Sequence, residues 1–238
     1  MRGSYGMELT KNCSTCKLKG NGFFCQLAPS ALKDLDTIKF TSAYQQNAVL
    51  FMEKEAPRGI FVLCDGQVKL SVSSSEGKTL ILRIAKPGEV LGLMSVLSGT
   101  PYEVTAEVLR PCQVAFVRRE NFLRFLAQHP EAYQAVVGQL GSQYHTACEQ
   151  IRTLGLSSSV TERLAKLLLD WSVGAAETKT GVRTKLPLTH EEIAEFIGTT
   201  RESVTRTLSE FKSRQLVILQ GSTLTIPDRA ALQTCAAA

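Results

Sequence analysis

The apolar residues of the chain follow two different periods in different regions. From about residue 38 to residue 118, short apolar runs alternate with polar residues, and turn signals such as Asp65-Gly66 and Glu76-Gly77 recur between them. Such runs, with turns every 8–12 residues or so, are typical of a small β-roll, barrel or sandwich. Its interior either holds one ligand or is filled by side chains. The predicted strands are 48–51, 59–63, 67–72, 79–84, 104–108 and 112–117.

Helical spacing replaces this alternation on both sides of the roll. Short helices are predicted at 30–36 and 120–128, and a longer one begins near Pro130, because proline suits the first helical turn. Apolar residues of the long helix lie alternately four and three positions apart, which makes a heptad seam. The seam residues are Tyr133, Val137, Leu140, Tyr144, Ala147, Ile151 and Leu154. We interpret the seam as a two-stranded parallel dimer interface; the alternative is a helix packed on its own roll.

A polar break at 156–159 precedes a predicted helix at 160–171 and a polar loop at 174–185. Residues 188–211 then predict two short helices around a tight turn. In the first, Thr189 caps the start and Gly198 the end. The pattern Thr199-Thr200-Arg201-Glu202 is a capping box for the second. Its inward face holds Val204, Leu208 and Phe211.

The opposite face of the second helix carries side chains suited to base edges. They are Arg201, Glu202, Thr205, Arg206 and Ser209. Arginine binds guanine, glutamate accepts from cytosine, and the threonine methyl contacts thymine. Residues 215–226 alternate and turn at Gly221-Ser222, which predicts a β-hairpin. Two helices followed by such a wing form a winged helix that reads double-stranded DNA; the alternative is a helical hairpin with a solvated charged face.

These elements predict an α+β chain with four parts. They are a cysteine-containing segment at 1–28, a β-roll sensor domain of the jelly-roll type at 29–128, a dimerisation helix at 129–156, and a winged-helix DNA-binding domain at 157–238.

Composition limits the possible classes further. With 238 residues, 44% hydrophobic and 21% charged, the chain is long enough for two globular domains. The net charge of +5 permits nucleic-acid binding without predicting it. No apolar run reaches the ~20 residues that cross a bilayer, and no apolar signal core is found near the N-terminus, so we expect a cytoplasmic protein. Two alternatives stay open for residues 1–6: they are an added leader, with Met7 as the natural start, or they belong to the natural chain.

Seven cysteines in a cytoplasmic protein indicate thiols, metal ligands or redox groups rather than structural disulfides. Cys13 and Cys16 form a C-x-x-C pair, and Cys25 follows after eight intervening residues. The pair places two sulfurs within reach of one metal or cluster, with a third nearby. The alternative is a partly exposed loop with incidental thiols.

A roll, a long helix and a winged helix containing Arg201-Glu202-x-x-Thr205-Arg206 resemble the CRP/FNR family of bacterial transcription regulators, from about residue 10 onward. The resemblance implies a homodimer that binds a two-fold symmetric operator, with RNA polymerase as a partner and base contacts from Glu202 and Arg206. Arg201 resembles the residue found at this position in the CRP branch, and Thr205 resembles the one found in the FNR branch. The DNA sequence of each operator half-site therefore stays open between the two branch types.

The resemblance also bears on the signal that the roll senses. Members that bind cyclic AMP carry a Gly-Glu-Leu segment and an Arg-Ser pair that hold ribose and phosphate. This chain has Gly92-Leu93-Met94 and Tyr102-Glu103 at the matching places. A phosphate that faced Glu103 with no arginine nearby would lack a charge partner, so we expect no cyclic AMP binding.

The N-terminal cysteines are similar to those of FNR-type oxygen sensors, which hold a [4Fe-4S] cluster through three N-terminal cysteines and one from the roll. The resemblance implies that the first three ligands are Cys13, Cys16 and Cys25. The family's fourth position aligns with Ala115. Cys112 lies three residues before Ala115, and side chains three residues apart on one strand point to opposite faces. Cys112 could therefore serve as the ligand only if it lies in the loop before the strand, as Pro111 permits. Cys112 is our first candidate and Cys64 the reserve.

Oxygen, nitric oxide or redox state would be the signal at such a cluster. Three alternatives keep the DNA-binding module: a zinc site, a thiol–disulfide switch, and a small effector inside the roll. A metal-dependent β-barrel enzyme is the remote alternative, because it needs clustered histidine and carboxylate ligands. The chain has only His129, His145 and His190, none of them in the roll, and we expect no enzyme. We assign Cys148 to the long helix and Cys235 to a frayed tail.

Overall fold

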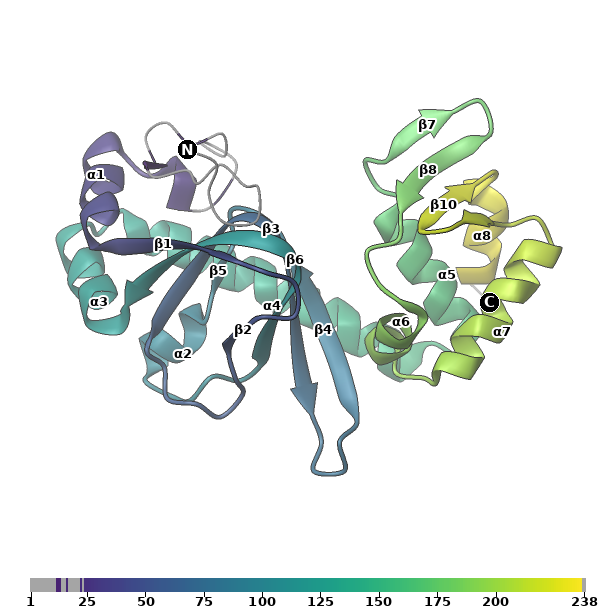
Figure 1. Ribbon diagram of the computed structural model, residues 1–238, viewed down its shortest axis with the longest axis horizontal. Helices are drawn as coiled ribbons and strands as arrows, with labels where there is room; N and C mark the ends of the chain where they lie inside the picture. Colours follow the sequence, from purple (N-terminus) through teal and green to yellow (C-terminus); the bar gives the residue numbers. More distant parts are fainter. Residues whose placement is uncertain (1–11, 14–15, 17–21, 23, 237–238) are drawn as a thin grey trace. The chain divides into compact units, whose positions relative to one another are not determined.

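The computed structural model describes residues 12–13, 16, 22 and 24–236 (Figure 1). The expectation about residues 1–6 and Met7 lies outside these residues. The chain divides into two compact units, and the division falls inside helix α4 (Ala132–Leu156), after Thr146. No helix in the described residues is long and apolar enough to cross a membrane.

The first unit is built on an antiparallel roll. Its strands are β1 (Lys39–Tyr44), β2 (Val49–Phe51), β3 (Gly59–Ser73), β4 (Thr79–Ala85), β5 (Val90–Leu91) and β6 (Thr105–Arg118). They follow the order β1-β6-β3-β4, with β2 paired to β6 and β5 paired to β3. The long strands β3 and β6 therefore form the centre of the sheet and determine which side chains share a face.

Two predicted strand pairs turn out to be single strands. The runs 59–63 and 67–72 both belong to β3, and 104–108 and 112–117 both belong to β6. The Asp65-Gly66 signal therefore marks an irregularity within β3, where the register against β6 shifts, rather than a chain reversal. A Cβ at Gly66 would lie 2.4 Å from the Pro111 carbonyl oxygen, so glycine is required for this close approach.

Helices cover the roll and enclose its larger core. They are the 3₁₀ turn η3 (Phe24–Gln26) and the helices α1 (Pro29–Ile38), α2 (Leu93–Ser98) and α3 (Arg119–Gln128), together with the first turns of α4. The helices expected at 30–36 and 120–128 are confirmed, whereas β1 and α2 were not predicted. Helix α4 begins at Ala132, two residues after Pro130, because residues 129–131 form a preceding turn.

In its described residues, the second unit combines the C-terminal part of α4 and four complete helices with a small sheet. The helices are α5 (Val160–Trp171), α6 (His190–Ile197), α7 (Arg201–Ser213) and α8 (Arg229–Ala236). The strands are β7 (Ala176–Thr178), β8 (Gly181–Lys185), β9 (Ile218–Gln220) and β10 (Thr223–Ile226), in the order β7-β8-β10-β9. The prediction of an α+β chain with a roll, a long helix and a winged helix is confirmed.

Three local predictions about the second unit are wrong. The region 174–185 is a hairpin rather than a loop, because β8 pairs with β10 and extends the wing. Helix α7 is capped by Thr200, which accepts from the Ser203 amide, rather than by Thr199 with Glu202. Cys235 is buried in α8 and does not lie in a frayed tail.

Candidate DNA-binding face and cysteine pocket

Helices α6 and α7 owe their positions to their caps and to one buried face. Thr189 and Glu192 form a reciprocal capping box at the start of α6, and Gly198 ends it in a left-handed conformation. This sharp ending lets α7 begin three residues later at an angle to α6. The inward face of α7 is fully buried, as predicted: its residues are Val204, Leu208 and Phe211, joined by Thr207.

The five predicted base-reading residues all lie on the exposed face of α7. The Thr205 hydroxyl donates to the Arg201 carbonyl over 3.0 Å, and the Ser209 hydroxyl donates to the Thr205 carbonyl over 2.9 Å. Their hydrogens are therefore used within the helix. Among the described residues, no hydrogen bond or ion pair engages the guanidinium groups of Arg201 and Arg206. These two groups are the available donors on this face.

The predicted seam of α4 is mostly exposed in the single chain. Tyr133, Val137, Tyr144 and Ile151 expose 48%, 67%, 74% and 69% of their surface, and Ala147 is also exposed. The remaining two seam residues, Leu140 and Leu154, are half-buried, since Leu140 packs on the roll and Leu154 lies beside Gly198. A row of large apolar side chains left in water is typical of a surface that another protein covers.

Four cysteines lie around one small pocket of about 20 Å³ in the first unit. They are Cys13, Cys16, Cys25 and Cys64. The pocket wall also includes Ala115, the position where the resemblance places the fourth ligand. Ala115 pairs directly with Val62, and Cys64 follows Val62 by two residues on β3. Alternate residues of a strand share a face, so Cys64 points the same way as Val62.

Cys112, our first candidate for the fourth ligand, is not part of this pocket. It lies within β6 rather than before it, opposite Tyr44 of β1, and is fully buried in the smaller core of the roll. Three residues along the strand from Ala115, it faces the other side. The structure instead brings the reserve candidate, Cys64, to the three N-terminal cysteines. Cys148 is half-buried in α4, as assigned.

Burial dominates the electrostatics of Cys13, Cys25 and Cys64. It raises the pKa of Cys25 to about 11 and that of Cys64 to about 12. It also raises the pKa of Cys13, although a hydrogen bond from Lys39 opposes the rise. The thiolate is the nucleophile and the metal ligand, so burial keeps Cys13, Cys25 and Cys64 in the unreactive thiol form until a metal displaces the protons.

Within the described residues, no three His, Cys, Asp or Glu side chains are grouped closely enough to hold a metal ion. A zinc ion draws four sulfurs to within about 2.3 Å of one point. The four cysteines surround their pocket without converging on such a point. An iron–sulfur cluster would take cysteine thiolates as its ligands, and all four cysteines lie around one wall. The donor set of Cys13, Cys16, Cys25 and Cys64 therefore fits a cluster.

Aromatic side chains fill the interior of the roll. The Phe51 and Tyr102 rings are stacked with centroids 4.1 Å apart, and Phe61 lies 5.3 Å from Phe51. The Tyr102 hydroxyl donates to the Gly59 carbonyl over 2.6 Å, which fixes the ring in place. The neighbouring Glu103 accepts a hydrogen bond from Ser95. The segment that would hold a cyclic nucleotide thus contributes a core ring and a carboxylate.

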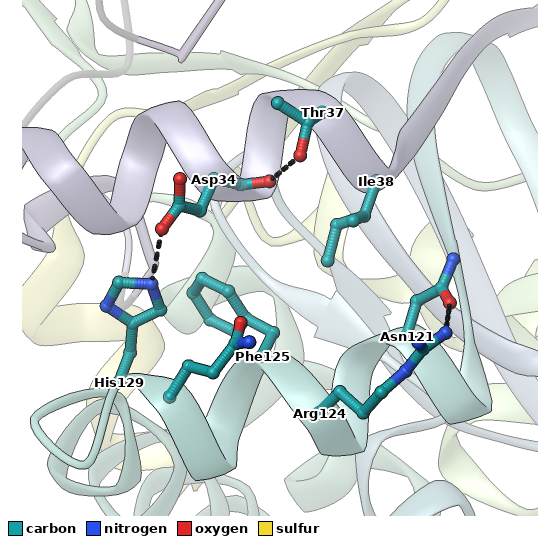
Figure 2. A pocket seen from close by; sticks show the side chains of 8 residues that line it. Asp34, Thr37, Ile38, Asn121, Arg124, Phe125 and His129 are labelled. Atoms are coloured by element: carbon teal, nitrogen blue, oxygen red, sulfur yellow. Dashed lines mark hydrogen bonds and ion pairs between the residues drawn. The ribbon is translucent and has the colours of Figure 1, made fainter.

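A second pocket, of about 510 Å³, lies between α1 and α3 (Figure 2). Figure 2 shows His129 at one end of it, bonded through Nε2 to Asp34 over 2.9 Å. The other ring nitrogen, Nδ1, lies 3.2 Å from Glu131. The two carboxylates therefore meet opposite sides of the ring and cannot share a metal ion with it. Their contacts fix the turn that leads into α4.

Comparison with known proteins gives two family matches. Residues 41–129 match the cyclic nucleotide-binding domain, and residues 162–235 match the Crp-like helix-turn-helix domain. The transcriptional activatory protein AadR of Rhodopseudomonas palustris is 26% identical over 209 residues, which cover 87% of this chain and 86% of AadR. A CRP-like cAMP-activated global transcriptional regulator of Mycobacterium tuberculosis is 24% identical over 208 residues, covering 87% of this chain and 92% of the regulator.

The fold itself is similar to that of FixK2 from Bradyrhizobium japonicum. The TM-score is 0.74 at 22% identity, covering 84% of this chain and 98% of FixK2. Together, the two family matches span most of the region from residue 41 to residue 235 in the order that the structure shows. The chain belongs to the CRP/FNR family of DNA-binding transcription regulators, and not to a family of enzymes.

Proposed function

We propose that this regulator senses oxygen, nitric oxide or redox state through a [4Fe-4S] cluster held by Cys13, Cys16, Cys25 and Cys64. The observation that carries the proposal is that these four cysteines line a single pocket between the N-terminal segment and the roll. A bound cluster would supply a centre that oxidants destroy. The protein would supply four thiols and a largely apolar wall. It would also connect the site to α4, because residues near Cys25 pack in the same core as the first turns of α4.

The same pocket disfavours the alternative sensors. A thiol switch needs accessible cysteines with a lowered pKa, whereas burial raises the pKa of Cys25 and Cys64. Zinc needs sulfurs that converge on one point, and none of the described groups has that arrangement. A nucleotide in the roll would have to displace the stacked rings of Phe51 and Tyr102. We therefore propose that the sensor lies at the cysteines and that the roll binds no cyclic AMP.

The output of the regulator follows from its two other surfaces. The exposed apolar row on α4 is proposed as the homodimer interface, because burying it removes large side chains from water. A dimer related by a two-fold axis presents two copies of α7 to the two halves of a symmetric operator. Loss of the cluster would change packing along α4 and so change DNA affinity. RNA polymerase is the proposed partner at the promoter.

Anaerobic reconstitution with Fe²⁺ and sulfide tests the cluster. The wild-type protein should gain iron, sulfide and a broad absorption band at about 400–420 nm that air removes. Cys64→Ser should lose the band, whereas Cys112→Ser should retain it, because Cys112 lies in the other core of the roll. A colourless wild-type protein would refute the cluster. Retention of the cluster in Cys64→Ser together with its loss in Cys112→Ser would refute the choice of fourth ligand.

Binding titrations at fixed salt test the DNA-reading face. Arg206→Ala should lose about 1–3 kcal/mol of discrimination between the operator and single-base variants. Arg214→Ala is the matched control: it removes an exposed arginine from the far end of α7, where the side chain pairs with Glu210. The control should weaken binding to all sequences alike or leave it unchanged. Unchanged specificity in Arg206→Ala would refute its role.

A further inference from the structure

A buried lysine lies at the wall of the cysteine pocket. Lys39 is the first residue of β1, and only 5% of its side chain is exposed. Its ammonium group lies 3.0 Å from the Cys13 sulfur and 2.5 Å from the Asp36 carboxylate. Lysine is almost never buried without a partner. Here the backbone holds it in place, since Lys39 pairs with Val117 of β6, which lines the same pocket.

Asp36 completes a closed arrangement with Lys39 and Cys13. Both of its carboxylate oxygens accept from the Cys13 backbone amide, over 3.0 and 3.1 Å. The carboxylate therefore fixes the backbone of Cys13, while the ammonium group fixes its sulfur. An ion pair that served only to end α1 would need neither contact with Cys13. The geometry is that of a ligand held from two sides by outer partners, as is usual around metal sites.

We propose that Lys39 is a positioning residue that orients the Cys13 sulfur toward the proposed cluster and partly neutralises its charge. The inference rests on the proposed function. It adds that Lys39 controls the stability and the reduction potential of the cluster. A thiolate-ligated cluster brings negative charge into an apolar pocket, and the buried ammonium group balances part of it.

The inference is tested by the direction in which the cluster's reduction potential shifts when a charge is removed at Lys39 or at Asp36. Removing a positive charge near the cluster disfavours the reduced, more negative state, so Lys39→Met should shift the reduction potential to a more negative value. Removing the negative charge of Asp36 should do the opposite, so Asp36→Asn should shift it to a more positive value. A purely structural ion pair predicts no such difference in sign.

The experiment uses full-length protein reconstituted anaerobically with Fe²⁺ and sulfide. Lys39→Met should release iron to a chelator about 10–100-fold faster than wild type. Lys39→Arg keeps the charge and should stay within about threefold of wild type. Lys33→Met, an exposed lysine of α1, is the matched control and should leave both iron release and potential unchanged. Circular dichroism verifies that each variant is folded.

Four outcomes are distinguishable. A wild type that assembles no cluster overturns both the proposed function and this inference. A wild-type cluster with unchanged iron release and potential in Lys39→Met overturns the inference alone. Potential shifts of the same sign in Lys39→Met and Asp36→Asn also overturn it. Shifts of opposite sign, with Lys39→Arg close to wild type, support it. If Lys39→Met does not fold, Asp36→Asn decides alone: a more positive potential supports the inference, and an unchanged or more negative potential overturns it.

Discussion

Gln139 should be one of the most important polar side chains for the stability of the first unit. It lies in α4, is 1% exposed, and bonds the Val90 backbone twice. Its side-chain amide donates to the Val90 carbonyl over 2.6 Å, and its carbonyl accepts from the Val90 amide over 2.9 Å. These two bonds attach the helix to β5 of the roll.

Gln139→Met keeps the size of the side chain and removes both bonds. Each buried backbone group left without a partner costs about 1–3 kcal/mol, so two groups give a loss of about 2–6 kcal/mol. Some of this loss is recovered if water enters, so we expect a value toward the lower end. Urea unfolding followed by circular dichroism at one fixed protein concentration measures it, since dimerisation makes stability depend on concentration.

Gln134→Met is the matched control, because Gln134 is exposed on the same helix. Its effect should stay within about 0.5 kcal/mol. Hydrogen exchange at the Val90 amide gives a second, local measurement and should speed up in Gln139→Met alone. A loss below about 1 kcal/mol with unchanged exchange at Val90 would show that the two bonds contribute little, and would refute the reasoning.

Two further predictions concern the roll and the second unit. Gly92→Ala should destabilise the protein by about 1–3 kcal/mol more than Gly77→Ala. Both glycines have positive φ, but only at Gly92 would the new Cβ lie 2.7 Å from the Tyr102 ring. Equal losses of stability in the two variants, measured by thermal unfolding, would contradict this prediction. The Lys166 ammonium group lowers the pKa of Glu162 from 4.5 to about 2, so the unfolded chain takes up a proton first as the pH falls. The stability that the Glu162 carboxylate contributes should be present above pH 4.5 and lost as the pH falls toward 2. Glu162→Gln should remove this pH dependence when unfolding is followed by tryptophan fluorescence. A variant with the same pH profile as wild type would contradict the prediction.

The sequence by itself determined the DNA-binding module and the order of the domains. In α6 and α7 the apolar face, the exposed arginines and the caps of α6 are set by residues a few positions apart, and helical geometry is the same wherever such a pattern occurs. The cap of α7 was predicted one residue too early. Val204, Leu208 and Phe211 are therefore buried as predicted. The apolar row on α4 could be found for the same reason.

The tertiary structure decided which cysteines meet and what lies beside them. The choice between Cys112 and Cys64 depends on whether residues 104–117 form one strand or two, and on how β3 pairs with β6. Spacing along the chain does not fix that pairing, because contacts across a sheet join residues far apart in sequence. Lys39 was missed for the same reason: it lies 26 positions from Cys13, and its one local sign was a lysine between Ile38 and Phe40. Only the pairing of β1 with β6 brings its charge to the pocket.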